Sequence, residues 1–464
     1  IVIFSDGTAQ AGGLMPDERR TNVYKLFRAT RVGPDTDINP EKQQAFYDPG
    51  LGSSTDGKGL KNWPYRLVYG LLSKMTGLGI TRNIIDRYAE IVRLYEPGDR
   101  IFLLGFSRGA YTVRCVGGVM ALCGVPTTGG GDKPLKRDAK SVRAIAAEGV
   151  ETVYKHGSGR KAERFKEQRI ELGKLFREKY GANSKDSEKS NVVPHFIGVL
   201  DTVASPGYNS LIALGVFIVM AVMAACLVWL SSWLSDVSFW RSFIYWFAFE
   251  AVVFAVLYVR GRLKFTNKIK GTSTWDTLHL TGTRMEFYNT DLNPDVEYAK
   301  HALAIDEKRK NFDRVPWSPP GKTSGKKSAW FEQIWFAGNH SDIVGSYPEN
   351  EARLSDISLK WVVEKATGVK PPLEVDFRFL NAHPSSAGLQ HDELKRSIIP
   401  WPEKLRCVPP DAILHPTVIE RFKLSAIVDY DQTKKYRPEN LRPHKDVAEF
   451  YAEGDADEPE NQNS

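Results

Sequence analysis

The chain has 464 residues, of which 42% are hydrophobic and 26% are charged, and its formal net charge is +7. This length allows one large domain or two to three smaller ones, and the composition is that of a globular protein. The mild positive charge suits an anionic surface such as a layer of phospholipid headgroups, or simply a solvated surface with a modest excess of lysine and arginine. No dense basic patch with interleaved aromatic residues occurs, which argues against a nucleic-acid partner.

The predicted elements alternate between strands and helices from the first residue. In the first part of the chain we expect them at residues 1–4 (strand), 22–30 (helix), 44–47 (strand), 80–95 (helix) and 101–104 (strand). Such β-α-β alternation is typical of a parallel, doubly wound sheet. Further core elements are expected at residues 192–200 (strand), 284–289 (strand), 295–305 (helix), 333–337 (strand) and 354–366 (helix).

Ser107 lies in the motif Gly-Phe-Ser-Arg-Gly-Ala, between the predicted strand at 101–104 and a predicted helix. This is the context of a G-x-S-x-G nucleophile elbow, in which a tight strand-to-helix turn holds the serine hydroxyl clear of the sheet. The motif alone would arise by chance about one time in five in such a chain, so its context decides. The alternative is a glycine-rich turn in which Ser107 only caps the helix.

Two long apolar runs follow in the middle of the chain. Residues 211–230 contain no charged side chain and are long enough to cross the core of a bilayer. Residues 243–259 form a second run, interrupted only by Glu250, whose charge is costly inside a membrane. We expect a transmembrane helical hairpin that anchors the chain in the lipid bilayer through residues 211–259. The alternatives are a buried hydrophobic hairpin and an element that lies on the lipid surface.

The charges around this hairpin predict its orientation. Five basic residues follow it directly: Arg260, Arg262, Lys264, Lys268 and Lys270. Because positive residues favour the cytoplasmic side, we expect the flanking catalytic portions in the cytoplasm. The predicted organisation is then a first part of the core at 1–209 with a charged helical insertion at about 132–190, the hairpin at 210–260, a second part of the core at 261–367, and an irregular C-terminal region at 368–464 that ends in a disordered acidic tail.

A serine nucleophile needs a histidine to take its proton and a carboxylate to orient that histidine. Of nine histidines, His340 is the best placed, in a turn after a predicted strand. Asp201 ends another predicted strand and is the preferred acid, with Asp342 and Asp306 as weaker candidates. The order Ser, Asp, His is the one expected along an α/β-hydrolase chain. The alternatives are a turn histidine bonded to local backbone for His340 and a cap or turn residue for Asp201.

Backbone N–H groups are expected to form the oxyanion hole. One is that of Arg108 at the helix N-terminus, and the other comes from the loop near Gly7 or Thr8. Asp6 in the same loop is expected to brace it. A phosphatase-like nucleophilic Asp6 is the rival interpretation, but the segment lacks the second aspartate that an aspartyl phosphotransferase would place two residues on.

The four cysteines are scattered, at positions 115, 123, 226 and 407, without C-x-x-C or Cys/His spacing. Neither a disulfide framework nor a zinc site is predicted, which is compatible with a reducing compartment. No cofactor is predicted, and calcium, which some lipases use, stays open. Because the chain starts directly on a strand without Met, we expect a trimmed fragment in which no targeting signal can be read.

Five segments in this order resemble one family. They are Phe4-Ser5-Asp6-Gly7-Thr8, Gly105-Phe106-Ser107-Arg108-Gly109-Ala110-Tyr111, Gly198-Val199-Leu200-Asp201-Thr202-Val203, His301-Ala302-Leu303-Ala304-Ile305-Asp306-Glu307 and Trp335-Phe336-Ala337-Gly338-Asn339-His340-Ser341-Asp342-Ile343-Val344-Gly345. Together they are similar to the DUF2235 family of α/β-hydrolases, which includes the catalytic domain of type VI secretion phospholipase effectors. The resemblance covers about residues 1–365. One departure is that Val344 and Ser346 flank a lone Gly345, where the family shows a run of glycines.

The resemblance implies a triad of Ser107, Asp201 and His340 and phospholipase activity on membrane glycerophospholipids. The predicted fold class is therefore α/β: an α/β-hydrolase-like, doubly wound, mostly parallel sheet with helical insertions and the inserted transmembrane hairpin. The expected function is a membrane-associated serine hydrolase that cleaves acyl esters of phospholipids. The alternatives are an esterase or thioesterase on soluble acyl compounds and a catalytically inactive membrane-tethered scaffold. A resident enzyme and a secreted effector remain equally open, and no segment identifies a secretion-system or immunity partner.

Overall fold

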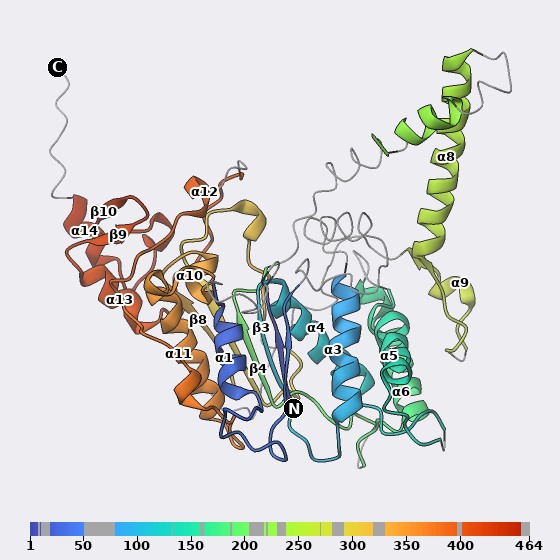
Figure 1. Ribbon diagram of the computed structural model, residues 1–464, viewed down its shortest axis with the longest axis horizontal. Coiled ribbons are helices and arrows are strands. Elements are labelled where there is room, and N and C mark those ends of the chain that lie inside the picture. The colour runs from blue at the N-terminus through green and yellow to red at the C-terminus, as the bar shows by residue number, and fades with distance from the viewer. Residues whose placement is uncertain are drawn as a thin grey trace.

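The computed structural model of the protein describes residues 1–7, 10, 19–50, 79–131, 133–157, 162–185, 188–203, 218–219, 221–229, 238–269, 271–280, 292–318, 330–396 and 401–455 (Figure 1). Several predictions fall outside these ranges, and the structure gives no account of them. They concern Thr8, the strand at 284–289, part of the first apolar run and the end of the acidic tail.

Within the described part of the chain, six parallel strands form one central sheet in the order β2-β1-β3-β4-β7-β8. Their bounds are Val2–Ser5 (β1), Ala45–Asp48 (β2), Phe102–Phe106 (β3), Phe196–Leu200 (β4), Tyr298–Ala304 (β7) and Phe331–Phe336 (β8). The prediction of a mostly parallel sheet in an α/β protein is therefore confirmed. Because all six strands run the same way, the loops after β1, β3, β4 and β8 meet at one edge of the sheet.

Helices cover both faces of this sheet (Figure 1). One face carries α3 (Ile80–Leu94), α4 (Arg108–Cys123), α5 (Ala139–Glu148) and α6 (Lys166–Tyr180), and the other carries α1 (Asn22–Thr30), α10 (His340–Val344) and α11 (Arg353–Thr367). Side chains alternate between the two hydrophobic cores along each strand. In β3, Leu103 packs into the core beside α3 and α4, whereas Phe102 and Leu104 pack into the core beside α11. This explains the continuous apolar run that precedes Ser107.

The expected helix at 295–305 is a strand instead. β7 pairs in parallel with β4 and β8, and it occupies an inner position of the sheet. Its alanines favour a helix by intrinsic propensity, but pairing on both edges and burial on both faces override that preference. Lys300 in this strand is buried and forms an ion pair with Glu332 of β8, with 2.9 Å between Nζ and Oε1. Because a buried charged side chain stands in this strand, the sequence does not show the regular alternation by which a strand is predicted.

The C-terminal residues pack against the far end of the sheet. Leu303 and Ile305 at the end of β7 and Trp335 of β8 form a third hydrophobic core with Phe422 and other C-terminal side chains. The described residues also form shorter elements: η1 (Gly149–Tyr154), η2 (Ala162–Phe165), β5 (Leu263–Lys264), α9 (Thr274–Thr277), β6 (His279–Leu280), η3 (Lys310–Phe312), η4 (Glu349–Glu351), η5 (Phe377–Phe379), α12 (Glu393–Arg396), α13 (Pro416–Lys423), β9 (Ile427–Asp429), β10 (Gln432–Lys434), η6 (Glu439–Leu441) and α14 (Glu449–Asp455).

The transmembrane hairpin predicted over 211–259 is not supported. Among the residues described, no helix combines the length and the apolar character that crossing a bilayer requires. The second apolar run lies in α8 (Phe239–Arg262), which projects from the body of the protein (Figure 1). Trp240, Tyr245 and Phe249 of this helix are exposed. The hydropathy of a sequence alone does not show whether a helix crosses a bilayer or carries its apolar side chains on the surface of the protein.

Candidate active site

Ser107 occupies the turn between β3 and α4, which is where the motif predicts it. Its backbone has φ 56° and ψ −120°, a conformation that residues other than glycine rarely adopt. The Ser107 N–H donates to the carbonyl of Leu200 at the end of β4, at 3.1 Å. The turn thus places the start of α4 directly behind the serine, and the chain carries the backbone strain typical of a nucleophile elbow.

The two glycines of the motif are required by close backbone contacts. A Cβ atom on Gly109 would lie 2.0 Å from the Ser5 carbonyl oxygen, and one on Gly105 would lie 2.7 Å from the Gly109 carbonyl oxygen. Any larger residue would therefore push α4 away from β1 or from β3. The glycines allow the helix to begin directly over the ends of these strands.

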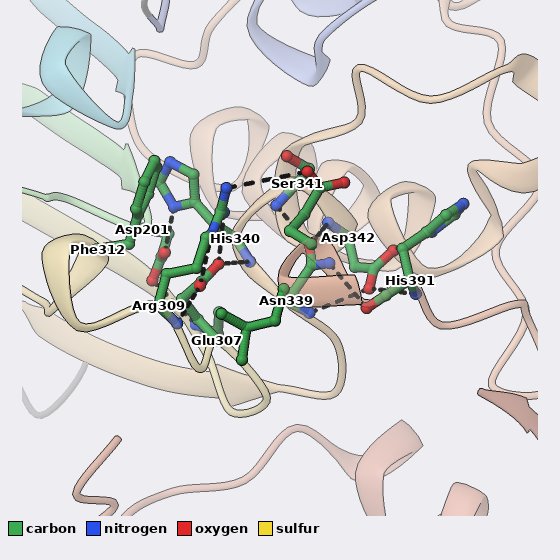
Figure 2. Close-up of polar contacts among 12 residues, drawn as sticks. Asp201, Glu307, Arg309, Phe312, Asn339, His340, Ser341, Asp342 and His391 are labelled. Atoms are coloured by element: carbon green, nitrogen blue, oxygen red, sulfur yellow. Dashed lines mark hydrogen bonds and ion pairs between the residues drawn. The ribbon is translucent and has the colours of Figure 1, made fainter. Parts of the chain in front are cut away.

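His340 and Asp201 lie together at the same edge of the sheet (Figure 2). The Asp201 Oδ2 atom is 2.5 Å from His340 Nδ1. Asp201 follows β4 directly and has φ 42°, and its Oδ1 accepts a hydrogen bond from the Ala304 N–H at 3.1 Å. His340 is the first residue of α10, and its N–H donates to Glu307 at 3.2 Å. The carboxylate therefore fixes the tautomer with the proton on Nδ1 and leaves the lone pair on Nε2.

The His340 ring is enclosed by two aromatic side chains. Its centroid lies 4.7 Å from that of Phe106, the neighbour of Ser107, and 5.2 Å from that of Phe312. Within the described residues, Nε2 of His340 is buried and has no hydrogen-bond partner. Burial lowers the pKa of His340 below its ordinary value, although the Asp201 hydrogen bond and charge act in the opposite direction. Burial therefore favours the neutral imidazole, and Nε2 is its nitrogen without a hydrogen-bond partner among the described residues.

Asp201 is fully buried but stays ionised. Burial opposes its charge, yet the Arg406 guanidinium and then the hydrogen bond from His340 outweigh this effect and hold the pKa of Asp201 well below its usual range. Arg406 comes from the C-terminal region, where no motif pointed to it. Glu307, which accepts from the His340 N–H, and Arg309, which pairs with Glu307, were also missed, although Glu307 lies within one of the family-like segments.

The loop after β1 carries another buried carboxyl group. Asp6 accepts hydrogen bonds from Thr21 Oγ1 at 2.5 Å, from the Tyr47 hydroxyl at 2.6 Å and from the Gly7 N–H at 2.7 Å. Burial raises the pKa of Asp6 to about 6 against these hydrogen bonds. Asp6 is therefore positioned to brace the loop, and it engages the Gly7 N–H that was a candidate oxyanion donor. Arg108 begins α4, so its N–H lies at the positive end of that helix.

The other carboxylate candidates have different partners. Asp342 accepts hydrogen bonds from the Asn339 N–H and from the N–H and ring of His391, with 2.7 Å between Oδ1 and Nδ1 of that ring (Figure 2). Asp306 accepts from the Gly338 N–H at 2.6 Å. Both therefore hold the turns around His340 rather than the His340 ring. Among the residues described, no group of three or more His, Cys, Asp or Glu side chains could hold a metal ion.

The chain is similar to one protein family and, over part of their length, to other known proteins. The family model described as "T6SS, Phospholipase effector Tle1-like, catalytic domain" matches residues 1–231 and 259–365. An uncharacterized protein of Saccharomyces cerevisiae is 30% identical over 133 residues, which are 28% of this chain and 18% of that protein. The crystal structure of an uncharacterized protein from Pseudomonas aeruginosa has a TM-score of 0.33 and 15% identity, over 82% of this chain and 47% of the other. The chain thus spans less than half the length of either relative.

Proposed function

The chain belongs to the Tle1-like family of phospholipase effector catalytic domains of the type VI secretion system, and from this premise we propose that it hydrolyses carboxylic acyl esters of phospholipids with Ser107 as the nucleophile. His340 would act as the general base and Asp201 as the carboxylate that orients it. The observation that carries this proposal is the buried Asp201–His340 pair, whose free Nε2 belongs to a ring packed on the neighbour of Ser107.

The proposed reaction has two halves. Ser107 Oγ attacks the ester carbonyl carbon while His340 Nε2 takes the hydroxyl proton, and the tetrahedral oxyanion is held by the Arg108 N–H with a second donor from the loop after β1. Collapse breaks the bond to the lysophospholipid oxygen, which receives the proton from His340 and leaves an acyl-enzyme. Water, deprotonated by His340, then attacks the acyl carbon and releases a fatty acid and free Ser107.

We further propose that α8 contacts the lipid surface from which the substrate comes. Among the side chains of this helix that the structure describes, nine large apolar ones are exposed: Phe239, Trp240, Ile244, Tyr245, Phe249, Val252, Val253, Val256 and Val259. Exposed apolar surface of this extent is rare on monomeric proteins and marks an interaction site. Most of α8 falls in the gap between the two segments matched by the family model, so it is an addition to the shared catalytic domain. Family membership favours the secreted effector over a resident membrane enzyme.

Product analysis by mass spectrometry on phosphatidylglycerol and phosphatidylethanolamine vesicles tests the proposed chemistry. Wild type should release fatty acid and lysophospholipid, whereas Ser107→Ala, Asp201→Asn and His340→Ala should each lose about 10³-fold or more in turnover. A fluorophosphonate probe should label wild type but not Ser107→Ala. Equal turnover in all four proteins would refute the triad. Activity confined to short soluble esters would instead indicate an esterase, and an unlabelled folded wild type would indicate a scaffold.

A further inference from the structure

Arg406 reaches the site from outside the region that the family model matches, which ends at residue 365. It is buried, with 3% exposure, and its guanidinium contacts both oxygens of Asp201. Nη1 lies 2.6 Å from Oδ1 and Nη2 lies 2.9 Å from Oδ2. The same two nitrogens donate to the carbonyl oxygens of Ala304, at 3.1 Å, and Phe312, at 2.6 Å. The group is therefore held in one plane by four acceptors.

The segment around Arg406 is tied to the loop that follows β7. Lys404 N–H donates to the Lys308 carbonyl at 2.7 Å, and Lys310 N–H donates to the Pro402 carbonyl at 2.9 Å. The Asn440 side-chain amide donates to the carbonyls of Arg406, at 3.2 Å, and Ile305, at 2.8 Å. Backbone and side-chain bonds thus fix the arginine relative to the carboxyl ends of the core strands.

We propose that Arg406 is a positioning residue of the active site, which holds the Asp201 carboxylate in the plane that receives His340 Nδ1–H and balances its charge so that His340 stays neutral in mildly acidic solution. The inference rests on the proposed function of Ser107, Asp201 and His340. It makes the C-terminal region a contributor to the chemistry as well as to folding.

The physical argument concerns the charge inside a water-excluded site. An isolated buried carboxylate would be strongly stabilised by a proton, taken either on itself or on the adjacent imidazole. A cation paired with both carboxylate oxygens makes this protonation much less favourable. The protonated imidazole would then lie next to a carboxylate–guanidinium pair that has almost no net charge. Burial is the main cause of the lowered pKa of His340, and it acts against the raising effect of Asp201.

Other charged groups also act on Asp201 and His340, and the effect of a substitution at Arg406 depends on them. Among the described residues, the titratable and charged groups that act on Asp201, His340 and Arg406 are Glu307, Arg309, Asp313 and His301, and His301 in turn faces Arg114 and Arg314. Glu307 is itself paired with Arg309, with 2.7 Å between Oε2 and Nη2, so these two charges largely offset each other. His301 is neutral at physiological pH, since burial lowers its pKa to about 3. Removal of Arg406 would thus leave the site with a net negative charge.

Two substitutions at Arg406 separate charge from geometry. Arg406→Lys keeps the cation but loses the planar fork, so kcat should fall about tenfold while the acid limb of kcat/KM stays in place. Arg406→Met removes the cation, so the acid limb should move to higher pH by about one unit and kcat should fall on the order of 100-fold. Arg421→Met is the matched control, because Arg421 is an equally buried C-terminal arginine that bonds the carbonyls of Ser386 and Gly388. It should lower the melting temperature without moving the acid limb.

The titration of His340, followed by histidine ¹⁵N NMR, provides a readout independent of turnover. In Arg406→Met its midpoint should move to higher pH, whereas in Arg421→Met it should match the wild type. The proposal is overturned if wild type hydrolyses phospholipid and the folded Arg406→Met protein shows wild-type values for both the acid limb and the His340 midpoint. If the midpoint moves but wild type hydrolyses no ester, the proposed function fails while the role of Arg406 stands.

Discussion

At the scale of single residues, the chemistry of this site depends on buried polar groups that differ in how far their charges are balanced. Asp201 is paired with a guanidinium and an imidazole, and its pKa is lowered. Asp6 has neutral hydrogen-bond donors around it, and burial raises its pKa to about 6. The two carboxyl groups thus respond to pH in opposite ways, although both are almost completely removed from water.

Asp6 should make folding depend on pH. Its folded pKa of about 6 lies above the ordinary value of 3.8, so the folded state retains a proton that the unfolded state releases. Its contribution to stability is present below about pH 4 and is lost as the pH rises towards 6, by at most about 3 kcal/mol. Urea unfolding of wild type and Asp6→Asn from pH 4 to pH 7 measures this. The stability of the variant relative to wild type should rise across that interval, and a constant difference would contradict the assignment.

At the scale of elements, the junction between β3 and α4 depends on contacts that only glycine permits. The Cβ of Gly109→Ala would meet the Ser5 carbonyl oxygen at 2.0 Å, so α4 would have to shift and carry Ser107 with it. We expect a loss of about 1–3 kcal/mol in stability and of about 10- to 100-fold in turnover.

Gly117→Ala in the same helix is the control for this prediction. Its Cβ would come closest to the flexible tip of Ile197, at 3.1 Å, and would lie at ordinary contact distances from Pro194 and Leu103. Alanine favours a helix over glycine by about 1 kcal/mol. The Gly117→Ala protein should therefore keep near-wild-type stability and turnover. Chemical denaturation and ester hydrolysis measured on both variants check the pair, and equal behaviour would show that the Gly109 contact is not critical.

Substitutions in α8 should weaken binding to lipid vesicles without changing the hydrolysis of soluble esters. Replacement of Trp240, Tyr245 and Phe249 by serine removes large exposed rings from one element remote from Ser107 in sequence. Co-flotation with anionic vesicles should fall by about tenfold or more, because burial of each such ring contributes on the order of 1–3 kcal/mol. Hydrolysis of a short soluble ester should be unchanged. Phe377→Ser, at an exposed phenylalanine in η5, is the control and should leave flotation unaffected. If the triple variant of α8 still floats with the vesicles, the proposal that α8 contacts the lipid surface is contradicted.

At the scale of the whole molecule, the C-terminal residues complete the core of the catalytic sheet. Trp335 N–H donates to the Ile413 carbonyl at 2.9 Å, and His415 N–H donates to the Trp335 carbonyl at 2.8 Å. Leu414 is thereby joined to β8 as a parallel bridge. Together with the third hydrophobic core, these bonds make the C-terminal layer continuous with the sheet that carries Asp201 and His340.

This continuity predicts one cooperative unfolding transition. Phe422 is almost fully buried in the third core, so Phe422→Ala should cost about 3–5 kcal/mol and lower the temperature of a single transition for the whole protein. Val428→Ala, at a largely exposed residue of β9, should change stability by less than about 0.5 kcal/mol. Calorimetry distinguishes the alternatives, since a separate early transition in Phe422→Ala would mean that the C-terminal layer unfolds independently.

Features that depend on local pattern could be predicted from the order of the amino acids. The β-α-β alternation indicated a parallel sheet, and the candidate residues Ser107, Asp201 and His340, each after a predicted strand, were expected at its carboxyl edge. Such information is local, because a turn motif and an apolar run report on the few residues that form them. The triad itself remains a prediction from this order and from the family-like segments.

Features that depend on distant partners became visible in the folded protein. β7 is a strand because β4 and β8 flank it, although its alanines favour a helix. Arg406 reaches Asp201 across more than two hundred residues of chain, and no local pattern marks an arginine for a buried carboxylate. The transmembrane span predicted from the apolar run in α8 is not supported among the residues described. Burial and charge balance are properties of the packed molecule, and they arise only when segments far apart in the sequence come together.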